Sequence, residues 1–199
     1  PREHYLPRAD WTPDGSRILA QQFNRSQTEL TVFRVDPATG EAKSLFVEKD
    51  AAWLENENPF RWLDDGKSFP WLSERTGWRH AYRAFVDGSP PVPITRGEFD
   101  VTAVDGIDKA GGWLYYTASP KNPTQRYLFR VRFDGSGTER LSPEKQPGWH
   151  EYDIAPDAQW AVHTRSTFTT PPVVELVRLS DHSTLRTLAD NAKLREKLA

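Results

Sequence analysis

The sequence predicts an all-β protein of the β-propeller class, with about four four-stranded antiparallel blades followed by a short C-terminal helix. A strand–turn–strand pattern recurs four times at intervals of about 46 to 51 residues, close to the repeat length of propeller blades. Eight Trp and 16 Pro among 199 residues favour short strands and turns over helices. Hydrophobic residues make up 37% of the chain, which is enough for a packed core.

The recurring hairpin consists of two strand-like runs joined by a turn that begins with Asp or Ser. Apolar and β-branched residues dominate the runs, and the turn residues Asp, Gly and Ser suit tight hairpin connections. The four turns are Asp36-Pro-Ala-Thr-Gly40, Asp87-Gly-Ser89, Asp134-Gly-Ser-Gly137 and Ser180-Asp-His-Ser183.

A second motif precedes each hairpin and adds two more strands to the unit. It is a strand, a turn rich in Pro, Asp and Gly, and another strand. The clear copies start at Trp11, Trp62 and Ile154, and a looser copy joins 101–104 to 112–116. We therefore expect blades near residues 5–46, 53–96, 99–142 and 150–188. A β-sandwich of similar hairpins is the alternative, and the repeated order of both motifs favours the propeller.

The last ten residues have a helical pattern instead. Asp190 is a suitable N-cap, and Leu194 and Leu198 lie four residues apart on one helix face. We expect residues 1–189 to form a partial propeller and residues 190–199 to form a helical linker. The chain contains no Met, so we also expect it to be a piece of a longer protein.

The composition argues against several functional classes. Lys and Arg number 26 against 28 Asp and Glu, a net charge of −2, whereas nucleic-acid binders carry a basic excess. The absence of Cys removes disulfides and thiolate chemistry. The five His are widely separated and form no His-Glu-x-x-His motif. We therefore expect no nucleic-acid partner, no metal and no cofactor.

The residues of a serine-hydrolase site are missing as well. Such a site presents its nucleophile in a Gly-x-Ser-x-Gly turn, and the sequence has no such pentapeptide. The consecutive residues Asp181, His182 and Ser183 are of the three types found in a Ser-His-Asp catalytic triad. Adjacent side chains, however, do not converge on one reacting atom. We interpret them as a turn, expect no catalytic residue in this chain, and expect the chain to be inactive alone.

Several segments, in order, resemble the propeller of the dipeptidyl-peptidase IV family of serine peptidases. The most specific is Ser73-Glu-Arg-Thr-Gly-Trp-Arg-His80-Ala-Tyr82, which is similar to that family's S-E-R-x-G-aromatic-R-H-x-Y stretch. The other matching segments are Ile94–Val101, Leu114–Ser119, Pro147–His150 and Leu188–Leu194. The resemblance covers nearly the whole chain and is strongest from Trp53 onward.

The resemblance implies an eight-bladed propeller that caps an α/β-hydrolase domain and helps to release N-terminal dipeptides. This chain would be its C-terminal four blades. The implied partners are the peptide substrate and the α/β-hydrolase domain of the same polypeptide, and the family allows a homodimer of the parent. The parent would be periplasmic, secreted or membrane-anchored. The family's paired-glutamate motif and its catalytic triad both lie outside this chain. The alternative function is a stand-alone propeller module of the TolB or WD-repeat kind that binds a protein partner.

One loop is a candidate for contact with substrate. The run Trp53-Leu-Glu55-Asn-Glu57-Asn-Pro59 is polar, begins with an aromatic residue and precedes a predicted blade strand. Members of the similar family carry a Trp-x-Asn type of segment here, facing the cavity between propeller and hydrolase. The resemblance thus implies that Trp53 and Glu55 line the approach of the substrate. The alternative is that Trp53 fills a gap between blades while the glutamates are solvated.

Overall fold

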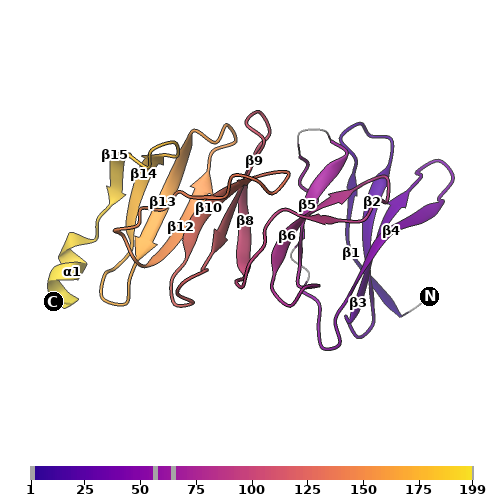
Figure 1. Ribbon diagram of the computed structural model, residues 1–199, viewed down its shortest axis with the longest axis horizontal. Coiled ribbons are helices and arrows are strands. Elements are labelled where there is room, and N and C mark those ends of the chain that lie inside the picture. The colour runs from indigo at the N-terminus through magenta and orange to yellow at the C-terminus, as the bar shows by residue number, and fades with distance from the viewer. Residues whose placement is uncertain (1–2, 56–57, 64–65, 199) are drawn as a thin grey trace. The chain divides into compact units, whose positions relative to one another are not determined.

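The computed structural model describes residues 3–55, 58–63 and 66–198, which form two compact units, Pro1–Thr95 and Arg96–Ala199. Each unit contains two antiparallel sheets (Figure 1). Neighbouring strands in each sheet are also neighbours in the sequence, as expected for propeller blades. The all-β class predicted from the repeats is confirmed.

The first unit contains a four-stranded and a three-stranded sheet. The first sheet consists of β1 (His4–Trp11), β2 (Ile18–Asn24), β3 (Glu29–Val35) and β4 (Ala42–Lys49). The second consists of β5 (Ser68–Ser73), β6 (His80–Phe85) and β7 (Val92–Pro93). The sequence predicts four strands in each blade, whereas this sheet has three, and β5 forms one of its edges.

Residues 58–63 lie along the outer edge of β5. Among the described residues, they take the place of a fourth strand without forming a regular strand themselves. The side-chain amide of Asn58 donates to the carbonyl of Leu72 at 3.0 Å, and its oxygen accepts from the N–H of Leu72 at 2.7 Å. The N–H of Leu63 donates to the carbonyl of Ser68 at 3.0 Å. The Asn58 side chain thus makes the two bonds that a partner strand makes in a regular ladder.

The core of the first unit lies between its two sheets. Inward-facing residues alternate along β2 and β3, as expected for strands with one buried face. They pack against the aromatic residues of β5, where Phe69 and Trp71 are buried. Phe46 meets the Trp71 ring edge-on, with centroids 5.1 Å apart. The aromatic content noted in the sequence therefore fills the space between two sheets.

The second unit contains two four-stranded sheets. The first consists of β8 (Val101–Asp108), β9 (Trp113–Ala118), β10 (Tyr127–Arg132) and β11 (Glu139–Arg140). The other consists of β12 (Trp149–Ile154), β13 (Trp160–Ser166), β14 (Val173–Arg178) and β15 (Thr184–Ala189). Their shared core includes Tyr115 and Leu128 on one side and Tyr152, Ala161 and Val177 on the other.

A short parallel bridge joins these two sheets. Arg126 pairs with Trp149, and its N–H donates to the carbonyl of Gly148 at 3.1 Å while its carbonyl accepts from the N–H of His150 at 3.1 Å. Gly148 has φ +139°, and a Cβ added there would overlap the backbone carbonyl of Ser166. Only glycine fits this position without strain.

The chain continues into a short helix, α1 (Ala192–Leu198), which confirms the predicted C-terminal helix. The carboxylate of Asp190 accepts from the N–H of Ala192 at 3.0 Å, close to the capping role predicted from the sequence. Among the described residues, no helix has both the length and the apolar character needed to cross a membrane.

Candidate functional site

The loop that carries Trp53 and Glu55 follows β4 and is fixed by local hydrogen bonds. The carboxylate of Asp50 accepts from the N–H groups of Ala52 at 2.7 Å and of Trp53 at 3.1 Å. These bonds favour the ionised carboxylate and hold the pKa of Asp50 below its ordinary value. The N–H of Leu54 donates to the carbonyl of Gln27 at 2.9 Å. The loop is therefore anchored at both of these points.

Trp53 and Glu55 line the same pocket, which has a volume of about 220 Å³ and lies in the first unit. The Trp53 side chain is 53% exposed, and Glu55 is also exposed. Asn56 and Glu57 of the same loop lie outside the described residues. The remaining lining residues come from β3, β4, β5 and the segments that flank β5: Leu30, Glu48, Leu54, Asn58, Trp71, Leu72, Ser73, Glu74 and Arg79.

An ion pair with a buried carboxylate lies at the wall of this pocket. Residue Glu48 is 6% exposed, and its carboxylate pairs with Arg75 and accepts from the hydroxyl of Ser73 at 2.9 Å. The guanidinium of Arg75 also lies over the ring of Tyr82, 4.8 Å from its centroid. These contacts hold the turn after β5, and that turn supplies Glu74 and Arg79 to the pocket.

Sequence reasoning did not identify Glu48, and a β-bulge explains why. The pairing of β3 with β4 shifts between Val32 and Phe33, so that Leu45 has no partner residue. The extra residue changes the alternation along β4, and both Leu45 and Glu48 are buried although they lie three residues apart. A period-two pattern assigns them to opposite faces, so no signal in the sequence places Glu48 in the pocket.

Trp71, which also lines this pocket, has a buried donor without a partner among the described residues. Trp71 is 1% exposed, and its indole N–H makes no hydrogen bond to any described residue. An unpaired buried donor is costly to the fold. Together the pocket offers an exposed indole, three carboxylates, a guanidinium and this N–H. Polar and aromatic groups of these kinds can fix the orientation of a polar ligand by contact and hydrogen bonding.

The residues Asp181, His182 and Ser183 form the turn between β14 and β15, as the sequence predicts. The hydroxyl of Ser183 donates to the carboxylate of Asp181 at 2.6 Å, whereas the Nε2 atom of His182 lies 2.8 Å from the hydroxyl of Tyr152. Ser183 is thus hydrogen-bonded to Asp181, whereas His182 points toward Tyr152 and away from Ser183. This is the arrangement of an Asx-type turn.

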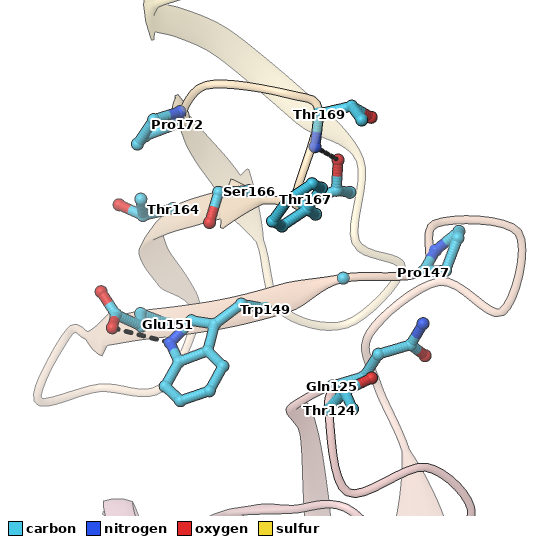
Figure 2. A pocket seen from close by; sticks show the side chains of 12 residues that line it. Thr124, Gln125, Pro147, Trp149, Glu151, Thr164, Ser166, Thr167, Thr169 and Pro172 are labelled. Atoms are coloured by element: carbon cyan, nitrogen blue, oxygen red, sulfur yellow. Dashed lines mark hydrogen bonds between the residues drawn. The ribbon is translucent and has the colours of Figure 1, made fainter.

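A larger groove of about 800 Å³ lies in the second unit (Figure 2). The antiparallel register places Trp149 opposite Ser166 and Glu151 opposite Thr164, so these four side chains share one face of the sheet. The indole N–H of Trp149 donates to Glu151 at 3.0 Å (Figure 2). The opposite face, with His150 and Tyr152, is buried.

The groove is therefore part of a sheet face that lies opposite the core of the second unit. Phe168, which also lines the groove, is fully exposed. We take the smaller pocket as the candidate functional site because both residues that the sequence predicts, Trp53 and Glu55, line it.

Comparison with known proteins gives consistent matches. A model of the family described as dipeptidyl peptidase IV (DPP IV) N-terminal region matches residues 1–172. The probable dipeptidyl peptidase 4 of Emericella nidulans is 31% identical over 219 residues, covering 100% of this chain and 27% of the relative. The probable dipeptidyl peptidase 4 of Aspergillus flavus is 27% identical over 199 residues, covering 94% of this chain and 25% of the relative.

Among solved structures, the crystal structure of Porphyromonas gingivalis dipeptidyl peptidase 4 is similar to this chain with a TM-score of 0.86 and 27% sequence identity. The match covers 98% of this chain and 27% of that chain. The chain thus spans about a quarter of the length of each of these three relatives.

Proposed function

The chain belongs to the dipeptidyl peptidase IV N-terminal region family, and from this membership we propose that it is the non-catalytic propeller portion of a serine exopeptidase that releases N-terminal dipeptides. In this proposal the propeller restricts access and orients the peptide substrate. The bond-making residues belong to an α/β-hydrolase domain of the same polypeptide. The family match over most of the chain favours this function over a stand-alone interaction module.

We propose that Trp53 and Glu55 contact the peptide as it approaches the catalytic domain. The observation that carries this role is that both side chains are exposed and line one pocket. A peptide offers apolar side chains for the Trp53 ring and backbone N–H groups for the Glu55 carboxylate. The anchoring of the loop by Asp50 supports a fixed position for these contacts.

The test is steady-state hydrolysis of a dipeptidyl substrate by the full-length parent enzyme and its variants. Trp53→Ala and Glu55→Gln should lower kcat/KM for peptides by roughly ten- to 150-fold, because each removes a contact worth about 1.5–3 kcal/mol. The reactivity of the catalytic serine toward a small phosphonate reagent should stay unchanged, since neither residue touches the reacting atoms.

The control is Trp78→Ala, which removes another exposed indole from a residue that does not line the pocket. Its kcat/KM should remain at the level of the unmodified enzyme. If Trp53→Ala and Glu55→Gln instead reduce thermal stability and serine reactivity together, these residues are structural and the positioning role is wrong.

A further inference from the structure

Four aromatic rings pack together in the second unit, three of them stacked and buried and the fourth, His182, edge-on and partly exposed. We call them the histidine column: His150, Tyr152, His163 and His182. Its first two residues lie on β12, the third on β13 and the last in the turn before β15. His150 and His163 are fully buried, with near-parallel rings 5.0 Å apart. Tyr152 stacks on His163 at 4.5 Å, and His182 meets His163 edge-on at 4.8 Å.

The hydrogen bonds of the column fix where its protons lie at neutral pH. The Nε2 atom of His150 is 2.8 Å from the carbonyl of Gln146 and must donate, because a carbonyl only accepts. In neutral His150 the Nδ1 atom is then an acceptor, and it lies 2.9 Å from Nε2 of His163. His163 therefore carries its proton on Nε2, and its Nδ1 atom has no proton.

This arrangement leaves one buried nitrogen unsatisfied. The Nδ1 atom of His163 makes no hydrogen bond to any described residue, and the carboxylate of Glu175 lies 3.8 Å away. A second proton on His150 would have to occupy Nδ1 and would face the N–H of His163 across 2.9 Å. The contact is kept only if His163 moves its own proton to Nδ1, 3.8 Å from the carboxylate of Glu175, and accepts at Nε2. Protonation of His150 therefore requires His163 to change tautomer and places a charge in a buried site.

The column also connects the two sheets of the second unit. The hydroxyl of Tyr152 donates to the Ser142 hydroxyl at 3.2 Å, and Ser142 accepts from the N–H of Leu128 on β10 at 2.6 Å. The bond from His150 to Gln146 reaches the segment between β11 and β12. A change in the protonation of the column therefore alters hydrogen bonds between the sheet β12–β15 and the sheet β8–β11.

We propose that the histidine column is a pH-sensitive contact, which holds the sheet β12–β15 on the sheet β8–β11 while its histidines are neutral and weakens as they take up protons. Charged groups on every neighbouring element bear on this equilibrium. They are Arg140 on β11, Arg165 on β13, Glu175 on β14, Asp181 in the following turn and Asp105 on β8.

The direction of the effect follows from burial. Burial lowers the pKa of His150 to about 4 and of His163 to about 3, with further lowering from the neighbouring cations, and burial also lowers the pKa of His182. In an opened state these histidines return to their ordinary pKa near 6.5, so the opened state binds more protons. The contact is strongest above pH 6.5 and weakens as the pH falls toward 4. Each histidine raises the opening constant by up to about tenfold per pH unit.

The first experiment is hydrogen exchange of the chain between pH 7.5 and pH 5, compared with intrinsic exchange rates at each pH. Amides of β12 and β13 should lose at least about tenfold more protection than amides of β2 and β3 in the other unit. Equal losses in both units, or unchanged protection of β12 and β13, would overturn the proposal.

The second experiment compares the pH slope of stability in variants. The double variant His150→Phe/His163→Phe removes both partners of the hydrogen bond between the rings while keeping two stacked rings, and it leaves the carbonyl of Gln146 without the His150 donor. It should lose most of the slope between pH 6.5 and 5, whereas His4→Gln, an exposed histidine in the other unit, should keep it. A wild-type slope in the double variant contradicts the proposal.

Because the double variant could fold poorly, the imidazole NMR signals of the unmodified chain provide an independent measurement. The rings of His150 and His163 should remain neutral down to about pH 5 while the backbone signals stay native. If both rings instead become protonated near pH 6.5 in a fully native chain, the column does not respond to pH as proposed.

Discussion

Glu48 on β4 and Arg75 in the turn after β5 form an ion pair across the wall of the candidate site. The Glu48 side chain is 7% exposed and that of Arg75 is 29% exposed, so the pair is partly withdrawn from water. Loss of the carboxylate charge leaves the partly exposed guanidinium without its buried partner. The pair therefore links the stability of the first unit to the shape of the pocket.

Glu48→Gln should lower the free energy of unfolding by about 1.5–3 kcal/mol, because it removes a charge-assisted hydrogen bond from a buried position. Urea denaturation provides the measurement. The matched control is Glu29→Gln, which breaks the exposed pair between Glu29 and Lys49 on the neighbouring strands and should cost less than about 1 kcal/mol. Equal losses in the two variants contradict the burial argument.

Trp71→Ala and Trp53→Ala should differ sharply in stability. Truncation of a large buried aromatic side chain costs about 3–5 kcal/mol, and Trp71 is buried in the core of the first unit. Trp53 is more than half exposed, so its truncation should change the unfolding free energy by about 0.5 kcal/mol or less. Thermal denaturation distinguishes the two, and a large loss for Trp53→Ala identifies it as a packing residue.

Gly148→Ala should destabilise the second unit more than Gly40→Ala destabilises the first. Both glycines have positive φ, at +139° and +74°, and such strain costs about 1–3 kcal/mol. The methyl group at Gly148 also overlaps the backbone of Ser166, while at Gly40 it meets no atom within 4 Å. Comparable unfolding midpoints for the two variants would show that the backbone around Gly148 relaxes easily.

Phe168→Ser should leave the unfolding free energy within about 0.5 kcal/mol, because the ring is fully exposed. It should also reduce concentration-dependent self-association of the chain, since the ring belongs to the uncovered groove beside Trp149. Light scattering over a range of protein concentrations measures the second effect. A clear loss of stability would mean that Phe168 packs against other residues in solution.

Local features of the fold were predictable because they depend on residues close in the sequence. At Asp36, Asp87, Asp134 and Asp181 the carboxylate accepts from the backbone N–H two residues later. This bond forms within the turn itself, so the residue types alone indicate it. The four hairpins and the repeat therefore followed from the sequence.

Features that depend on register were not predictable in the same way. The bulge beside Leu45 turns Glu48 inward, and its position is set by pairing with β3. The histidine column requires Tyr152 to pair with His163 across β12 and β13. The sequence contains no motif that indicates this pairing. The exposed Trp53 and Glu55 were identified by family resemblance, and the anchoring of their loop became visible only in the structure.

The side chain of Asn58 has a consequence for how this chain tolerates change in length. It pairs with both backbone groups of Leu72, so the edge of β5 that does not pair with β6 is held at this point by one amide group and not by a continuous partner strand. Residues inserted between Asp50 and Asn58 would leave that pairing in register. Added length there changes the loop that carries Trp53 and Glu55 while the sheet keeps its pairing.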